Sequence, residues 1–179
     1  MRKIMTIAAA LVFSAAMFAQ AQPAAAAKAE EQTKVQEPAA PELEFVVQLH
    51  VELGQTYSVG KTTHGQRTII PITGGTFEGP DIKGEVLPGG ADYQMADAVT
   101  GHTEVEAIYC IRTDDGVNIH VRNNGIIAMG PDGMYFTCAP KFEAPADSKY
   151  AWLNNKLFVC RPSFGGMGGG ITLNVWMVK

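Results

Sequence analysis

Asp92 and Gln94 are the residues of this sequence whose types and spacing best suit chemistry in a closed cavity. They follow the pair Gly89-Gly90, which predicts a tight turn into an extended segment. Because side chains alternate along a strand, Asp92 and Gln94 share one face and Tyr93 lies on the other. If that face lines an apolar lumen, burial raises the pKa of Asp92 and makes it a candidate general acid or base. The alternative is that Asp92 bonds to the backbone of the turn, and the turn preference of aspartate favours this alternative.

Tyr109 is a candidate ligand-binding residue in a segment where apolar and polar positions alternate. Val105, Ala107 and Tyr109 fall on one face of this predicted strand. Glu104 and Glu106 fall on the other face, where paired acids can do acid–base work but are more often only solvated. The more apolar face is expected to point inward, so Tyr109 is predicted to offer its hydroxyl to a ligand in the lumen.

Two further groups are candidate ligand-binding residues, and each has a structural alternative. His64 and Arg67 lie where a loop meets a strand and can bind an anionic group or serve in local hydrogen bonding. Glu143, Trp152 and Asn154 lie around a predicted short helix. The aromatic residues there are expected to plug one end of the domain, and the alternative is that these three residues shape a pocket wall.

The sequence excludes several classes of site. No C-x-x-C or Cys/His spacing typical of a metal site occurs, and neither a metal nor a cofactor is expected. The glycine-rich run at 165–170 precedes a predicted strand, whereas a phosphate-binding loop needs a helix behind it. The formal net charge of −4 opposes binding to nucleic acid.

Cys110, Cys138 and Cys160 each lie in an apolar, strand-like segment. Three thiols leave at least one unpaired within a monomer, and an oxidising compartment permits one disulfide among them. A buried free cysteine behaves as a small hydrophobic residue. We therefore favour three free thiols over one disulfide.

The N-terminus has the three-part pattern of a cleavable secretory signal peptide. Met1-Arg2-Lys3 is basic, residues 4–18 are apolar, and Ala19-Gln20-Ala21 is a small-x-small cleavage site. The apolar run is too short for a transmembrane helix, so no membrane insertion is expected after cleavage. We expect a signal peptide at 1–21, a disordered linker at 22–41 and a periplasmic or secreted domain at 42–179.

Period-two alternation dominates the rest of the chain and predicts an all-β domain of nine or ten strands. Asp115-Gly116, Asn124-Gly125 and Asp132-Gly133 are predicted turns. Segments 67–73 and 76–78 are predicted as separate strands, and only 147–154 as a helix. Since no βαβ unit occurs, we expect an antiparallel barrel or sandwich.

Several segments resemble hallmark motifs of one family. They are His64-Gly65-x-Arg67, 72–80, 84–94, Tyr109-x-x-Arg112-Thr113-Asp114-Asp115-Gly116, Val121-Arg122-Asn123-x-Gly125, Pro140-x-Phe142-Glu143 and 150–154. Together they resemble the bacterial and fungal family called domain of unknown function 3237. The resemblance runs from about Leu43 to the C-terminus and implies a single β-barrel, roughly calycin- or lipocalin-like, with no established activity. The sequence departs from the family at Thr137, where Arg is common, and at Cys160, where Gly is common.

Three functional hypotheses follow. The first is an exported barrel that binds a small, largely apolar molecule in its lumen. The second is a lyase-, isomerase- or cyclase-type enzyme in which Asp92 moves a proton, and the third is a module that binds a partner through the barrel exterior. An apolar lumen with few titratable groups favours the first, a buried carboxylate beside a cavity the second, and a lumen filled by side chains the third.

Overall fold

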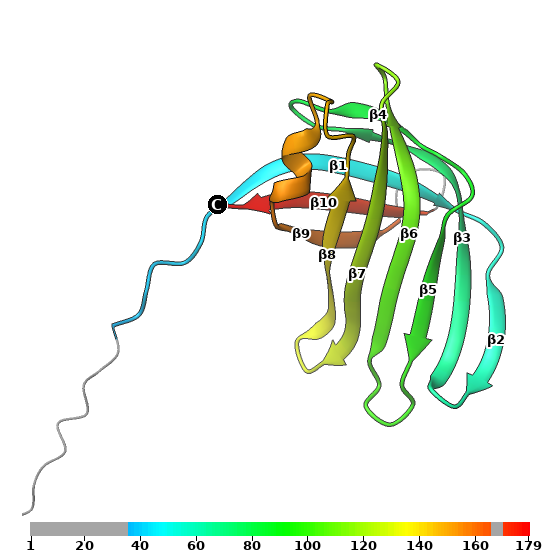
Figure 1. Cartoon of the computed structure of the whole chain (residues 1–179). Coiled ribbons are helices and arrows are strands. Elements are labelled where there is room, and N and C mark those ends of the chain that lie inside the picture. Colours follow the sequence, from blue (N-terminus) through cyan, green and yellow to red (C-terminus); the bar gives the residue numbers. More distant parts are fainter. Residues whose placement is uncertain (1–35, 166–169) are drawn as a thin grey trace, which may run out of the picture. The chain divides into compact units, whose positions relative to one another are not determined.

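Ten β-strands and one short 3-10 helix, η1, form the part of the chain that this computed structural model describes, residues 36–165 and 170–179 (Figure 1). The predicted signal peptide and residues 22–35 of the predicted linker lie outside the described residues. Within the described ranges, no helix has the length and apolar character needed to cross a membrane. The elements are β1 (Leu43–Leu53), β2 (Tyr57–Thr62), β3 (Gly65–Glu78), β4 (Lys83–Val86), β5 (Ala91–Ala96), β6 (Thr103–Thr113), β7 (Asn118–Gly130), β8 (Gly133–Glu143), η1 (Ala151–Asn155), β9 (Phe158–Phe164) and β10 (Ile171–Val178).

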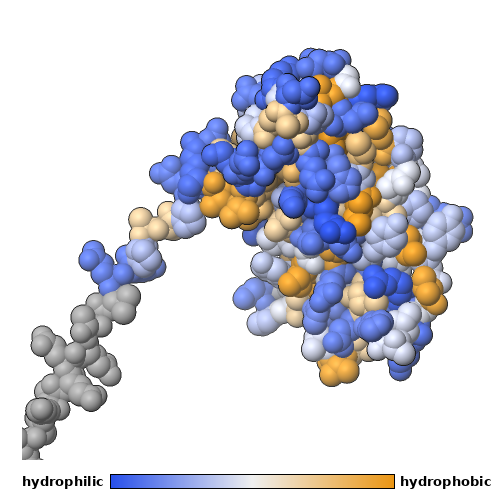
Figure 2. Space-filling view, in the orientation of Figure 1, coloured by the Kyte–Doolittle hydropathy of each residue, from blue (hydrophilic) through white to orange (hydrophobic). Residues whose placement is uncertain are grey.

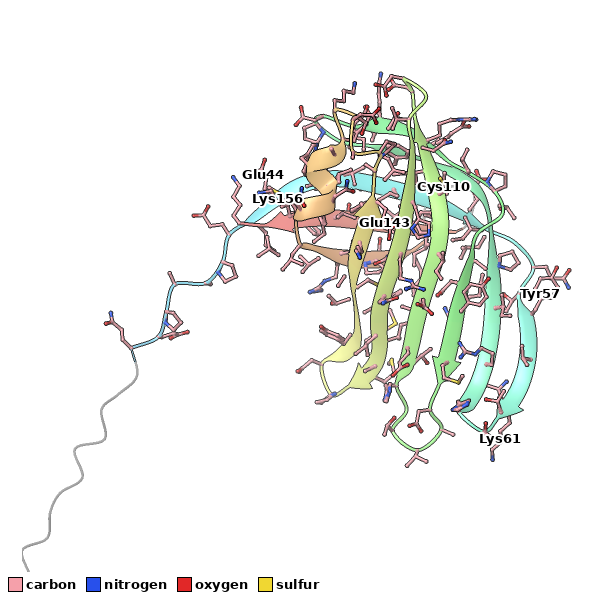
Figure 3. The ribbon with its side chains drawn as sticks, viewed as in Figure 1. Glu44, Tyr57, Lys61, Cys110, Glu143 and Lys156 are labelled. Carbon is pink, nitrogen blue, oxygen red and sulfur yellow. The ribbon has the colours of Figure 1, made fainter. Side chains whose placement is uncertain are left out.

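The strands form one antiparallel barrel. Neighbouring strands follow the order β1-β10-β9-β8-β7-β6-β4-β3, and the pairing of β1 with β3 closes this ring of eight strands. Strands β4 and β5 lie one after the other between β3 and β6. In the described part of the chain, β2 pairs with β3 alone, at the edge where Figure 3 labels Tyr57 and Lys61. The predicted all-β antiparallel barrel is confirmed.

Strand β3 corrects one local prediction, because segments 67–73 and 76–78 belong to a single strand. The glycines between them allow β3 to pass very close to β1. A Cβ atom on Gly75 would lie 2.0 Å from the carbonyl oxygen of His50, and the φ of Gly75 is 134°. A sequence reading that treats glycine as a strand breaker therefore divides a strand that glycine in fact makes possible.

Two other predictions also differ from the structure. Asn124-Gly125 lies inside β7 and not in a turn, because Gly125 makes room for the Cys138 side chain, whose Sγ would lie 2.3 Å from a Cβ there. The predicted helix at 147–154 is reduced to the five residues of η1. The turns at Asp115-Gly116 and Asp132-Gly133 are confirmed, with both glycines at positive φ.

The two ends of the barrel are filled differently. One end carries η1 and the β6–β7 turn, and we call it the η1 end (Figure 1). There the rings of Phe142 and Phe158 meet edge to face, with ring centroids 5.0 Å apart. Trp152 of η1 packs against Phe158, with ring centroids 6.2 Å apart. The opposite part, with the β5–β6 and β7–β8 loops, we call the cavity half. Aromatic packing closes the η1 end, so space for a ligand has to be sought in the cavity half.

The contact between β8 and β9 is the weakest backbone seam of the ring. Among the described residues the register of these strands holds one pair, Cys138 with Cys160, whereas β7 and β8 pair along their length. Pro140 on β8 and Pro162 on β9 lack the backbone N–H that a longer ladder needs. Phe164 of β9 stacks on Phe136 of β8 at 5.7 Å, so side chains cover part of this seam.

Candidate functional site

The barrel interior retains a cavity of about 70 Å³ in the cavity half. One water molecule takes up about 30 Å³ in the liquid, so a cavity of this volume holds only the end of a small molecule. The cavity opens between the side chains of its wall. Inward-facing side chains of β1, β3 and β5 to β10 line it. The lining residues are Val51, Leu53, Ile70, Ile72, Asp92, Gln94, Val105, Ala107, Tyr109, Asn123, Phe136, Cys138, Pro162, Phe164, Ile171 and Leu173.

Strand β5 brings Asp92 and Gln94 to the cavity wall, on the same face, as the alternation predicts. Gln94 Nε2 donates a hydrogen bond to Asp92 Oδ2 at 2.7 Å, and the backbone N–H of Glu106 donates to Asp92 Oδ1 at 3.1 Å. Burial raises the pKa of Asp92 above its ordinary value of 3.8, and these two hydrogen bonds lower it by less. The sequence favoured a bond from the Asp92 carboxyl to the backbone of its own turn. In the structure the carboxyl instead accepts from Gln94 and from the backbone of β6.

Tyr109 and Asn123 add two buried polar groups to the same wall. Tyr109 is 4% exposed, and burial strongly raises the pKa of its hydroxyl. Asn123 is also 4% exposed, and its Oδ1 atom accepts no hydrogen bond within the described part of the chain. Three of the predicted residues, Asp92, Gln94 and Tyr109, therefore lie together in the cavity wall, while their roles stay predictions.

Asn123 is a site residue that the sequence reasoning missed, although the same alternation contains the signal. Ile119 and Val121 are fully buried positions of β7, and Asn123 continues their face two residues further on. A polar residue in phase with a buried apolar series is either bonded inside the core or placed there for a ligand. The neighbouring Asn124 points to the other face and is exposed.

All three cysteines are free, as favoured from the sequence, and Cys138 and Cys160 are buried while Cys110 is half-buried. Burial raises the pKa of the Cys138 thiol to about 12 and that of Cys160 also well above its usual range. Both thiols therefore stay protonated at neutral pH, and neither is an activated nucleophile. Within the described ranges, no group of three or more His, Cys, Asp or Glu side chains is arranged to hold a metal ion.

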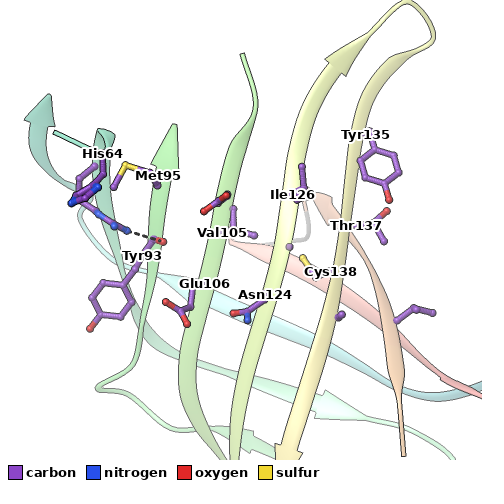
Figure 4. Close-up of a pocket in the computed structure, with 15 residues that line it drawn as sticks. His64, Tyr93, Met95, Val105, Glu106, Asn124, Ile126, Tyr135, Thr137 and Cys138 are labelled. Carbon is purple, nitrogen blue, oxygen red and sulfur yellow. Dashed lines mark hydrogen bonds between the residues drawn. The ribbon is translucent and has the colours of Figure 1, made fainter. Parts of the chain in front are cut away.

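His64 and Arg67 lie elsewhere, in a shallow groove of about 750 Å³ on the outer face of the sheet (Figure 4). Arg67 Nη1 donates to the backbone carbonyl of Tyr93 at 3.4 Å. Glu104 and Glu106 belong to the same outer face, and Glu106 pairs with an arginine of β7 at 3.3 Å. Figure 2 shows hydrophilic residues over much of the visible surface, interrupted by small apolar patches.

Glu143, Trp152 and Asn154 lie at the η1 end, away from the cavity. The Asn154 side chain accepts from the backbone N–H of Ala144 at 2.8 Å and donates to its carbonyl at 2.9 Å. Glu143 faces solvent and lies 3.9 Å from His120 (Figure 3). Asn154 and Trp152 hold the segment around η1 in place, and the plug is the alternative that their contacts favour.

The comparisons with known proteins agree with this architecture. The family described as "Protein of unknown function (DUF3237)" matches residues 41–178. A UPF0311 protein of Rhodopseudomonas palustris is 36% identical over 132 residues, which cover 66% of this chain and 85% of that protein. The crystal structure of a beta-barrel like protein from Acinetobacter baumannii has a TM-score of 0.71 and 31% identity, covering 80% of this chain and 99% of its own.

A fungal relative carries a functional name. The "Hydroalkoxylation enzyme phnH" of Penicillium herquei is 30% identical over 118 residues, covering 66% of this chain and 72% of that protein. A crystal structure described as an enzyme from Penicillium herquei matches with a TM-score of 0.64 and 27% identity, covering 81% of this chain and 99% of its own.

Proposed function

This chain belongs to the family described as Protein of unknown function (DUF3237), and we propose that it binds a small, largely apolar molecule inside its barrel. The observation that carries the proposal is the interior cavity, with a mostly apolar wall and a few polar groups from β5, β6 and β7. Sites for small molecules commonly combine an apolar lining with a few placed polar groups.

The wall of the cavity has one part that can move at low cost. Phe164 is 59% exposed, although its ring stacks on Phe136. The backbone seam behind these rings holds one register pair among the described residues. A ligand larger than the cavity can therefore extend toward solvent past Phe164 without breaking a long strand ladder. Each Å² of apolar ligand surface that is buried contributes about 25 cal/mol.

Native mass spectrometry of the full chain purified from its producing cells tests this proposal. We expect a mass increment of one small molecule that disappears in Ala107→Leu, because the larger side chain fills the cavity. The milder Ala107→Val serves if the first variant does not fold, with folding followed by circular dichroism. Tyr93→Ala is the matched control in the outer groove and should keep the increment. Retention in both Ala107 variants with loss in Tyr93→Ala contradicts an interior site.

Proton transfer by Asp92 is a second candidate function. It is supported by the raised pKa of the Asp92 carboxyl beside the cavity and by the similarity to a hydroalkoxylation enzyme. In such an addition, a protonated Asp92 gives its proton to an alkene carbon while a hydroxyl oxygen bonds the other carbon. The carboxylate then takes the hydroxyl proton, so the carboxyl is regenerated and atoms balance.

Asp92→Asn separates the two candidate functions. The amide keeps the shape of the side chain and cannot exchange a proton at neutral pH. An enzyme that uses Asp92 loses at least about a hundredfold in rate, the usual contribution of a general acid or base. A carrier keeps its bound molecule in this variant. Unchanged turnover of a hydroxyl-bearing alkene by Asp92→Asn would eliminate the proton-transfer role.

We also propose that the chain is exported to the periplasm or secreted, which the pattern of residues 1–21 supports. N-terminal sequencing of the protein from the extracytoplasmic fraction tests this proposal. The expected first residue is Gln22, and a chain recovered only with its initial Met1 contradicts export.

A further inference from the structure

The wall of the cavity contains a hydrogen-bond acceptor without a donor. Asn123 Oδ1 is buried, and no described residue donates to it. The Asn123 side chain is 4% exposed, so water outside the barrel does not reach the oxygen. Most buried polar atoms in proteins have a partner, so an orphan at the edge of a cavity indicates that a donor from outside the chain completes it.

The carboxylate in this wall is already engaged. Each oxygen of Asp92 accepts one hydrogen bond, from Gln94 Nε2 and from the Glu106 backbone. Among the buried side-chain nitrogen and oxygen atoms that the structure describes, Asn123 Oδ1 is the one without a hydrogen-bond partner, so it gains most from an incoming O–H or N–H group. The unpaired acceptor on β7 and the apolar side chains of Phe136 and Phe164 also set the orientation of a ligand. Its polar end lies near β7 and its apolar body toward the two phenylalanines.

The charge of the wall excludes anionic ligands. Among the cavity-lining residues that the structure describes there is no Lys, Arg or His. A carboxylate or phosphate entering here loses its hydration with no cation to replace it, and it meets the Asp92 carboxyl. The basic residues His64 and Arg67 lie in the groove on the opposite face of the sheet.

We propose that the ligand is a neutral molecule with a hydroxyl group, an alcohol or a phenol, which enters polar end first and donates to Asn123 Oδ1. This inference rests on the proposed interior binding and names the chemical class that the site selects. A fatty acid or other organic anion is excluded from the same cavity, although its apolar body has the same size and shape.

Three probes with matched carbon chains test this selection. 1-Hexanol and methyl pentyl ether are isomers, and of the two only the alcohol donates a hydrogen bond; hexanoate is anionic at pH 7. Binding is followed by NMR chemical shifts of the full chain at rising probe concentration. We expect 1-hexanol to bind about tenfold more tightly than the ether, as one net hydrogen bond gives. Hexanoate should bind at least about a hundredfold more weakly than 1-hexanol, because its charge stays uncompensated. Equal affinities for alcohol and ether, or tighter binding of hexanoate, overturn the inference.

Asn123→Leu tests whether Asn123 Oδ1 causes the preference for the alcohol. It should reduce the preference for 1-hexanol over the ether to about onefold, and Asn123→Ala gives the same readout if the leucine variant does not fold. Asn124→Leu, at the next residue on the outer face, is the matched control and should keep the tenfold preference. A preference that persists in both Asn123 variants overturns the inference.

Failure of the inference differs from failure of the proposed function. If alcohol and ether bind equally and Ala107→Leu abolishes both, the interior site stands and the hydroxyl selection falls. If Ala107→Leu leaves the binding of all probes unchanged, or if no probe binds, the interior site falls with it.

Discussion

Two aspartates at opposite ends of the barrel have opposite electrostatic surroundings. Asp115, at the η1 end, accepts hydrogen bonds from Thr113 Oγ1 at 2.6 Å and Tyr150 Oη at 2.9 Å. It also pairs with Lys149 at 2.9 Å, and these donors hold the pKa of Asp115 far below its usual range. Asp92, in the cavity half, has two donors, and burial outweighs them and raises its pKa. The same side chain is thus a fully bonded carboxylate at one end and a poorly solvated acid at the other.

The difference extends to other groups at the two ends of the barrel. At the η1 end, polar groups have partners and aromatic rings pack edge to face. In the cavity half, Asn123 Oδ1 has no described partner, Phe164 is exposed and β8 barely pairs with β9. Interactions left incomplete in the free protein are available to a ligand, which is how a site gains affinity at the expense of stability.

The largest expected effect concerns two phenylalanines. Phe158→Ala, at the η1 end, should lower the free energy of unfolding by about 3–5 kcal/mol, because Phe158 is 3% exposed and its loss leaves a cavity. Phe164→Ala, in the cavity half, should cost under about 1 kcal/mol, because its ring is already 59% exposed. Urea unfolding of both variants measures this contrast. Equal losses would mean that the two halves contribute alike to stability.

The next effect is at Asn154, which forms two hydrogen bonds to the backbone of Ala144. Asn154→Ala should lower the free energy of unfolding by about 1–2 kcal/mol, since each net hydrogen bond contributes about 0.5–1.5 kcal/mol. Asn155→Ala is the control at the adjacent position. If Asn154→Ala instead abolishes ligand binding with stability unchanged, Asn154 belongs to a pocket wall and the comparison between the two ends fails.

A smaller change in the free energy of unfolding is expected at Asn123. Asn123→Leu removes an acceptor that has no described donor, so the free energy of unfolding should stay within about 1 kcal/mol of the unsubstituted protein or rise. The same substitution at a fully bonded buried asparagine is strongly destabilising. A loss above about 3 kcal/mol, measured by urea unfolding, would show that Asn123 Oδ1 is satisfied in solution.

Residue alternation explains why part of the site could be predicted from the sequence. The face of Asp92 and Gln94 and the inward direction of Tyr109 depend only on period two and on which face is more apolar. The place of Asn154 depends on where η1 packs, and the separation of Arg67 from Asp92 depends on which face of β3 turns inward, because both faces of that strand carry isoleucine. These are tertiary facts, and local patterns do not contain them. Gly125 illustrates the same limit, because its contact with the Cys138 side chain, and not its own turn preference, decides its conformation.

The smallest effects concern pH, where the two aspartates should give opposite slopes. The folded pKa of Asp92 is raised, so its contribution to stability is complete below the unfolded pKa near 3.8 and is lost as pH rises through the folded pKa. The folded pKa of Asp115 is lowered, so its contribution to stability is present above the unfolded pKa near 3.8 and is lost as pH falls toward the folded pKa. Urea unfolding between about pH 3 and pH 6 compares the unsubstituted protein with Asp92→Asn and Asp115→Asn. The difference in unfolding free energy from Asp92→Asn should fall with rising pH, and that from Asp115→Asn should rise. Slopes of the same sign would show that Asp92 is hydrated in the folded protein, and a hydrated Asp92 is not the poorly solvated acid that the cavity half requires.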